Sequence, residues 1–239
     1  MSGHSKWATT HRTKEAADAK RGAAFTKISN LITLAARAGG GDSESNFQLR
    51  LAMEKAREAN MPKANIEKAI SRGTGGGEAG SLAEVVYEII GPAGSTFVVE
   101  AVTDNKNRTV GELKAAINKN GGQLGGPNSA LWMFKRQGEI IIEAPTGEAD
   151  EWELKIIDAG AEDLVIGETE WEIYSAPEAL PKVAEAIKAI GLTVKESSLI
   201  YRPKEELKID DPETREKIQK LYAVLDDLED VNNIYTNAK

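Results

Sequence analysis

The residues best suited to a chemical role lie near the N-terminus, where cations accompany a tryptophan. Residues 1–27 carry six Lys or Arg against two acids, and most of these cations fall in three short runs, GHSKW (3–7), HRTK (11–14) and DAKRG (18–22). Lysine and arginine bind phosphate oxygens, and an indole ring stacks on an unpaired base. The candidate nucleic-acid contacts are therefore Lys6, Trp7, His11, Arg12, Lys14, Lys20, Arg21 and Lys27. The simpler alternative is that Trp7 anchors the chain and that the lysines are only solvated.

A second candidate group lies in the loop TDNKNRT (103–109), between an expected strand and an expected helix. Free backbone N–H groups at a helix N-terminus bind phosphate or carboxylate, and Lys106 and Arg108 stand beside them. Asp and Asn are also ordinary turn and capping residues at such a place. Lys106 and Arg108 are thus candidate anion contacts, and nothing in the sequence gives Arg108 a structural role.

Signatures of catalysis are missing from the sequence. The run GGGEAG (75–80) fits the string G-x-G-x-x-G, but a dinucleotide site needs a strand before it and a helix after it, and here the order is reversed. We find no G-x-S-x-G, P-loop or H-E-x-x-H string, and no histidine follows His11. The chain has no cysteine, which excludes thiolate zinc sites and disulfides. We expect no enzymatic activity, no cofactor and no metal; a hydrolase that uses carboxylates alone is the weaker alternative.

Charge is distributed unevenly along the 239 residues, whose net charge is −8. Residues 1–75 hold thirteen Lys or Arg against seven Asp or Glu, a net charge of +6, and the rest holds 17 against 31, a net charge of −14. Clustered cations gain affinity for polyanions by releasing counterions from phosphates. The absence of cysteine fits a reducing cytoplasm, and neither a secretory signal nor a membrane-spanning apolar run of roughly 18 residues is present. These features predict a cytoplasmic protein with a nucleic-acid partner and no membrane partner.

The elements that must position these residues begin with a helical region. Apolar residues recur at three- and four-residue steps and predict helices at 13–38, 46–59 and from Met61-Pro62 to Gly73. The glycine-rich run 73–80 then predicts a flexible linker. Beyond it the period becomes two, with strands expected at 84–90, 96–103 and 131–135. A helix is expected at 109–120, with Thr109 and Glu112 as a capping box.

Residues 139–201 have the order of a complete ferredoxin-like unit, βαββαβ. Its expected elements are a strand at 139–143, a helix at 148–159, strands at 162–167 and 170–175, a helix at 178–190 and a strand at 192–201. A helix at 212–229 and a strand at 233–236 remain, and they cannot bury their apolar residues alone. We therefore expect the C-terminus to fold back onto the earlier sheet. The predicted α+β fold has a basic all-α domain (1–75), a discontinuous α/β domain (81–136 plus 203–239) and an inserted ferredoxin-like α/β domain (137–202).

The sequence resembles the YebC/PmpR family along essentially its whole length. The matching stretches are GHSKWA (3–8), DAKRG (18–22), FTK (25–27), AARAGGGD (35–42), NMPK (60–63), NIEKAI (65–70), RGTG (72–75), VEAVTDNKNRTV (99–110), NGGQLG (120–125), WMF (132–134), AGAED (159–163) and LDDLEDVNNIY (225–235). The resemblance implies a helical domain and two ferredoxin-like α/β domains, of which the middle one is discontinuous, and no enzymatic activity. The family includes DNA-binding transcriptional regulators and a mitochondrial translational activator of a cytochrome oxidase subunit. The family usually has a more basic run than Thr9–Thr13 after the tryptophan.

Three functions remain open on this basis. The first is a nucleic-acid-binding regulator of gene expression that acts on DNA. Its alternative is a ribosome-associated translation factor that binds ribosomal RNA and relieves stalling at proline-rich stretches, as the resemblance implies. The second is a protein-interaction module whose acidic α/β domains bind a basic partner, and the third is the carboxylate-dependent hydrolase. The sequence indicates neither the target sequence nor the oligomeric state.

Overall fold

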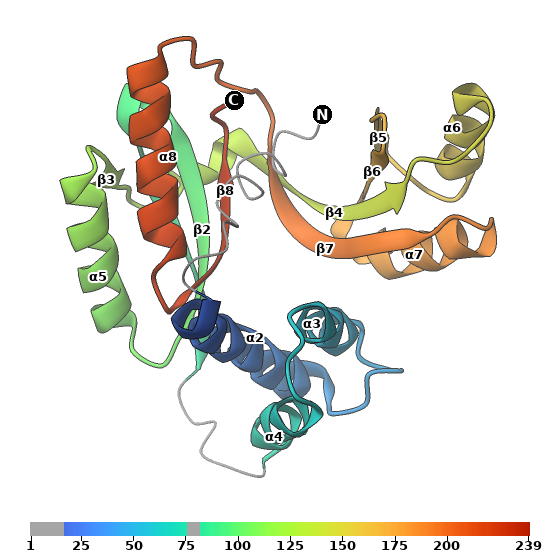
Figure 1. The fold of residues 1–239 in the computed structure, drawn as a ribbon, viewed down its shortest axis with the longest axis horizontal. Helices are drawn as coiled ribbons and strands as arrows, with labels where there is room; N and C mark the ends of the chain where they lie inside the picture. The colour runs from blue at the N-terminus through green and yellow to red at the C-terminus, as the bar shows by residue number, and fades with distance from the viewer. Residues whose placement is uncertain (1–16, 76–81) are drawn as a thin grey trace. The chain divides into compact units, whose positions relative to one another are not determined.

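The structure, a computed structural model, describes residues 17–75 and 82–239, with side chains from residue 22 onward (Figure 1). The described chain forms two compact units. One is Met133–Glu205, and the other consists of the described residues up to Trp132 together with Glu206–Lys239. The first sixteen residues, including the expected start of the first helix, lie outside the described residues, as does most of the predicted glycine linker (76–81).

The helical domain consists, in its described part, of α2 (Ala17–Gly39), α3 (Phe47–Glu58) and α4 (Lys63–Gly73). Its core is formed by side chains that the three-to-four-residue spacing places inward, namely Ile32, Ala36, Leu49, Ala52, Ala56, Met61, Ile66 and Ala69. Asn46 joins the helices, because its side chain accepts a hydrogen bond from Leu49 N (3.1 Å) and donates to Ala35 O and Gly40 O (both 2.8 Å). The second and third predicted helices are confirmed to within about two residues.

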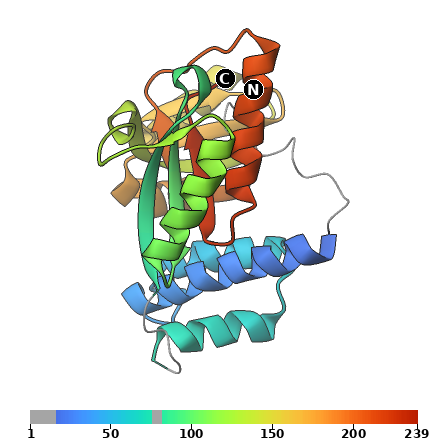
Figure 2. The ribbon, with the colours of Figure 1, turned by 90° about the vertical axis from the view of Figure 1, so that its left-hand side faces the viewer.

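The middle domain is a four-stranded antiparallel sheet with the order β3-β1-β2-β8. Its strands are β1 (Ala83–Ile90), β2 (Thr96–Thr103), β3 (Gln123–Leu124) and β8 (Val231–Thr236). Two helices, α5 (Lys106–Lys119) and α8 (Pro212–Asp226), lie side by side over the sheet (Figure 2). The predicted return of the C-terminus is confirmed, because β8 pairs with β2 and places Ile234 opposite Val99.

Glu88 on β1 fixes the segment that follows β3. Its carboxylate accepts hydrogen bonds from the backbone N–H groups of Asn128 (2.5 Å), Ala130 (2.6 Å) and Leu131 (2.6 Å). The residue is 8% exposed. Burial raises the pKa of Glu88, but the three N–H donors stabilise the charged form, and the net effect is a pKa below the usual value. A buried carboxylate thus orders the loop just before the chain enters the inserted domain.

The inserted domain is a second four-stranded antiparallel sheet, with the order β5-β6-β4-β7. Its elements follow the predicted order: β4 (Phe134–Glu143), α6 (Ala149–Asp158), β5 (Asp163–Ile166), β6 (Glu170–Ser175), α7 (Leu180–Ala189) and β7 (Val194–Pro203). The fully buried core contains Ile140, Ile142 and Ile173 of the strands with Ile156 and Ile187 of the helices. This arrangement confirms the ferredoxin-like prediction, and the fold class is α+β.

Several boundaries differ from the sequence predictions by two or three residues, and the largest differences have a structural reason. Helix α5 begins at Lys106 and not at Thr109, because the Asn105 side chain caps it by accepting from Arg108 N (3.2 Å). The strands expected at 131–135 and 139–143 are one strand, β4, preceded by a short 3-10 turn at Leu131–Met133. Inside β4, position 138 requires glycine, because a Cβ there would come within 2.6 Å of Ser175 Oγ and 2.8 Å of Leu180 Cβ. The two-residue strand β3 was not predicted.

Candidate nucleic-acid interface

Most of the predicted N-terminal contacts fall outside the part of the chain that the structure describes. Lys6, Trp7, His11, Arg12 and Lys14 all precede residue 17. Lys20 and Arg21 belong to the N-terminal part of α2, and their side chains are not among those described. Their role in binding stays a prediction.

Lys27 has a structural partner in addition to its predicted role. Its ammonium group donates a hydrogen bond to the carbonyl oxygen of Asp226 (2.7 Å), at the C-terminal end of α8. The last carbonyls of a helix have no partner within the helix and carry partial negative charge, so a lysine there is stabilising. Burial lowers the pKa of Lys27, and the nearby Asp226, Asp227 and Glu229 act in the opposite direction. Lys27 therefore links the helical domain to the middle domain.

Arg108 also acquires a structural role that the sequence did not show. One terminal nitrogen lies 2.9 Å from Asp104 Oδ1 and 3.1 Å from Asp230 Oδ1. Asp230, which is 6% exposed, also accepts a hydrogen bond from Thr109 Oγ1 (2.7 Å). Lys106 is exposed in the first turn of α5. Within this predicted pair, Arg108 is held by two carboxylates, while Lys106 stands at a helix N-terminus where an anion would be favoured.

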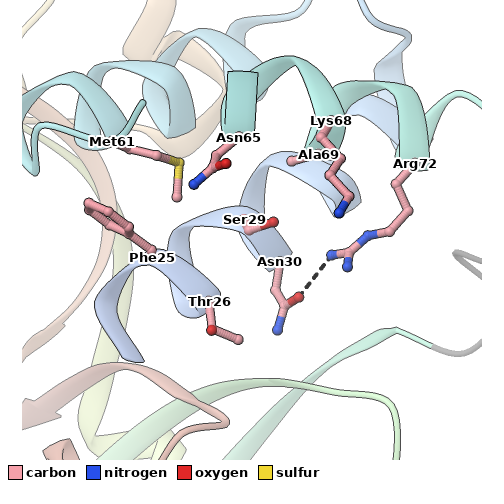
Figure 3. A pocket seen from close by; sticks show the side chains of 9 residues that line it. All are labelled: Phe25, Thr26, Ser29, Asn30, Met61, Asn65, Lys68, Ala69 and Arg72. Atoms are coloured by element: carbon pink, nitrogen blue, oxygen red, sulfur yellow. Dashed lines mark hydrogen bonds between the residues drawn. The ribbon is translucent and has the colours of Figure 1, made fainter. Parts of the chain in front are cut away.

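The helical domain contains a pocket between α2 and α4, with a volume of about 310 Å³ (Figure 3). Aromatic, thioether, amide, hydroxyl and cationic groups line it, and they come from Phe25, Thr26, Ser29, Asn30, Met61, Asn65, Lys68, Ala69 and Arg72. Phe25 and Met61 lie at one end, and Lys68 and Arg72 at the other (Figure 3). The pocket thus offers an apolar end, a polar middle and a cationic end.

Arg72 is held in place by α2. Its Nε and one terminal nitrogen donate to Thr33 Oγ1 (3.1 and 3.0 Å), and the same terminal nitrogen donates to Asn30 Oδ1 (3.0 Å). Thr33 is fully buried, and its hydroxyl lies 2.8 Å from Ser29 O. The close approach of the helices depends on Gly73, where a Cβ would come within 2.4 Å of Thr33 O. Among the described residues, the other terminal nitrogen of Arg72 has no hydrogen-bond partner, so it can bind an incoming anion.

Sequence reasoning did not identify this pocket. Asn65, Lys68 and Arg72 recur at three- and four-residue steps and so share one face of α4. Both stretches that contain them, NIEKAI and RGTG, are already part of the family resemblance. The spacing of these polar residues on one face of the expected helix was the only sequence signal that could have indicated the pocket. The contribution of Phe25 and Asn30 from α2 needed the helix packing to be known.

The inserted domain also carries two acidic side chains, Glu139 and Glu172, on one face of its sheet, and Glu172 is buried. Glu139 on β4 lies opposite Tyr174 on β6, and the Tyr174 hydroxyl donates to Glu172 Oε2 (2.5 Å). Burial, together with repulsion from Glu172 and Glu196, raises the pKa of Glu139 to about 7. Arg202, whose guanidinium carbon lies 3.9 Å from the centroid of the Tyr174 ring, offsets part of this negative charge.

Two further properties apply to the described ranges, 17–75 and 82–239. None of their helices is long and apolar enough to cross a membrane. They also contain no cluster of three or more His, Cys, Asp or Glu arranged to hold a metal ion.

Comparisons with known proteins agree with this architecture. Residues 5–76 match the TACO1/YebC protein N-terminal domain, and residues 82–238 match the TACO1/YebC second and third domain. A probable transcriptional regulatory protein of Caldanaerobacter subterraneus subsp. tengcongensis is 45% identical over 241 residues, which cover all of this chain and 98% of that protein. One from Persephonella marina is 45% identical, with 99% and 95% covered. The crystal structure of a conserved hypothetical protein from Aquifex aeolicus superposes with a TM-score of 0.85 at 38% identity, covering 98% of this chain and 96% of the other. The chain belongs to the TACO1/YebC family.

Proposed function

We propose that this protein is a cytoplasmic, non-enzymatic regulator of gene expression that binds DNA through its helical domain. The names of its relatives, probable transcriptional regulatory proteins, support the regulatory role. The observation that carries the proposal is the cationic helical domain, in which Lys68 and Arg72 share one face of α4. The proposed nucleic-acid contacts are Lys6, Trp7, His11, Arg12, Lys14, Lys20, Arg21, Lys27, Lys106 and Arg108.

The division into domains 1–75, 81–136 plus 203–239, and 137–202 belongs to the same proposal. The helical domain, with a net charge of +6, would contact the polyanion, and the acidic remainder would limit contact to this end of the chain. The two α/β domains would then serve as a scaffold or bind other proteins.

Ribosomal RNA is the alternative target, and the pocket is the observation that favours it. A base inside a duplex is stacked on both faces and does not reach a pocket between two helices without being extruded. Loops and bulges of structured RNA present unstacked bases at lower cost. In this version the protein acts as a ribosome-associated translation factor.

The test combines ribosome sedimentation with a genomic pull-down at physiological salt. The regulator proposal expects enrichment of DNA sites, and the alternative expects co-sedimentation with ribosomes. In both, the double variant Lys20→Glu/Arg21→Glu weakens binding, while Lys182→Glu/Lys188→Glu on α7, with the same charge change, does not. Absent or salt-insensitive binding to DNA and to ribosomal RNA would refute nucleic-acid binding. Partner binding that survives deletion of residues 1–75 would favour a protein-interaction module in its place.

A further inference from the structure

The pocket between α2 and α4 combines three kinds of group that one small ligand would have to match. Phe25 supplies an aromatic ring, and Met61 supplies a polarizable thioether on the same end (Figure 3). Lys68 and the fixed guanidinium of Arg72 form the other end. A ligand that fills the pocket must therefore carry a flat, largely apolar ring at one end and an anion at the other.

Hydrogen-bonding groups between the two ends are available to such a ligand. Among the described residues, the side-chain amide of Asn65 and the Nδ2 group of Asn30 donate no hydrogen bond. The Lys68 ammonium likewise forms no ion pair or hydrogen bond there. Amides can both donate to and accept from the edge of a heterocyclic ring. Unused donors that converge on one cavity are typical of a ligand site.

We propose that this pocket binds one unstacked nucleotide, with its base against Phe25 and Met61 and its phosphate at Lys68 and Arg72. The volume of about 310 Å³ lies at the lower end of the range for ligand pockets, about 300–1,000 Å³, and so suits one nucleotide and not a longer segment. Arg72 donates in the plane of its guanidinium and Lys68 acts as a point charge, a pairing suited to phosphate. The inference rests on the proposed function, because it specifies which part of a bound nucleic acid the helical domain would contact.

The location of the nucleotide in its strand follows from the energy of unstacking. Extruding a base from a duplex costs a few kcal/mol, whereas a bulged or looped base is already unstacked. The pocket should therefore prefer a strand with a bulge over a fully paired strand. A free nucleotide has the same chemistry, but it lacks the flanking phosphates that the other cations of the domain would bind.

Binding to RNA hairpins tests the proposal with the full-length protein. One hairpin carries a single-nucleotide bulge, a second is abasic at the bulge, and a third is fully paired. We expect the bulged hairpin to bind about 5- to 150-fold more tightly than the abasic one, since stacking on an aromatic ring contributes about 1–3 kcal/mol per base. Phe25→Leu retains an apolar side chain against the core but should remove most of this preference.

Two exposed positions keep the test independent of folding. Asn65→Asp places a negative charge in the pocket and should weaken binding of the bulged hairpin at least tenfold, and Lys68→Gln should weaken it severalfold. Lys63→Gln, on the same helix but outside the pocket, is the matched control, and it should leave the preference for the bulge unchanged. Urea denaturation of each variant confirms that the fold is retained.

The possible outcomes are distinguishable. If all three hairpins bind equally and Phe25→Leu and Asn65→Asp have no effect, the pocket proposal is wrong while nucleic-acid binding stands. If no hairpin and no duplex DNA binds, the proposed function fails as well. Titration with adenosine and uridine 5′-monophosphate provides the last arm: binding as tight as that of the bulged hairpin would overturn the assignment to a nucleotide within a strand.

Discussion

Replacing Glu88 by glutamine should loosen the loop that leads into the inserted domain. The carboxylate accepts three backbone hydrogen bonds of 2.5–2.6 Å from Asn128, Ala130 and Leu131. In Glu88→Gln the amide oxygen can accept two of them, whereas the NH2 group faces the third N–H donor to donor. The variant therefore loses the charge assistance of two bonds and leaves one partly buried N–H, that of Asn128, without a protein acceptor.

The magnitude follows from these three contacts. Hydrogen bonds to charged groups contribute about 1.5–3 kcal/mol and neutral ones about 0.5–1.5 kcal/mol, so two weakened bonds cost about 2 kcal/mol. An unsatisfied N–H adds roughly 1–3 kcal/mol when it is buried, and the partly buried N–H of Asn128 should add a value near the lower end of this range. Relief of the carboxylate's desolvation offsets part of this sum. We expect a net loss of about 2–4 kcal/mol in the stability of the loop.

Hydrogen exchange at the amides of Asn128, Ala130 and Leu131 measures this loss directly. Each 1.4 kcal/mol corresponds to a tenfold change, so protection should fall by about 30- to 1,000-fold. Glu84→Gln, an exposed position on the same strand, is the control and should change stability by no more than about 0.5 kcal/mol. Unchanged protection of these three amides in Glu88→Gln would refute the role assigned to the carboxylate.

The pH dependence gives a second measure of the same contacts. The pKa of Glu88 is lower in the folded state than its usual value of 4.5, so the unfolded state binds the proton more tightly. The stabilisation is present above pH 4.5 and is lost as the pH falls through the lower folded pKa. Wild type should therefore lose more stability than Glu88→Gln between pH 6 and pH 3.

Three further predictions concern charges elsewhere in the chain. Lys20→Glu/Arg21→Glu should lower nucleic-acid affinity at least tenfold at 0.15 M salt and reduce the slope of log affinity against log salt by about 2; superimposable salt plots would contradict the assigned phosphate contacts. Asp230→Asn should destabilise the middle domain by about 1–2 kcal/mol in urea unfolding, since the partly exposed pair with Arg108 weakens; an unchanged midpoint would show that the network contributes nothing. Because the folded pKa of Glu139, about 7, lies above its usual value of 4.5, the folded state retains a proton that the unfolded state releases, and stability should fall by up to about 3 kcal/mol from pH 4.5 to 7. Glu139→Gln should abolish this fall, and a retained fall would assign it to another group.

The elements predicted correctly are those whose signals are local. Helices α3 and α4 and the βαββαβ order follow from the spacing of apolar residues, which the buried core reproduces. The predicted start of α5 was wrong because TDNKNRT contains two possible N-caps, Asn105 and Thr109. Thr109 fits a capping box, but its hydroxyl instead donates to Asp230, 121 residues away, and Asn105 caps the helix. The choice depended on a partner that local sequence does not contain.

The candidate site was predictable in its charge but not in its geometry. The excess of cations in residues 1–75 indicated a polyanion partner, yet Lys27 turned out to contact a helix end and Arg108 to pair with two acids. Conversely, the pocket is formed by residues from two helices more than thirty positions apart, such as Asn30 and Arg72. Such a pair becomes visible only when the packing of α2 on α4 is known.

The pairing of β8 with β2 sets the order in which the chain can mature during synthesis. The Tyr235 hydroxyl donates to Glu100, 135 residues earlier, so the middle sheet stays incomplete until the C-terminus has left the translating ribosome. All strands of the inserted domain are made before β8, and that domain can fold first. Until then β2, with nearly all of its residues destined for the interior, is an unpaired edge prone to aggregation. Prematurely terminated chains should therefore be insoluble or degraded. Only the finished chain would have a stable middle domain, with the C-terminal end of α8 in place to accept the hydrogen bond from Lys27.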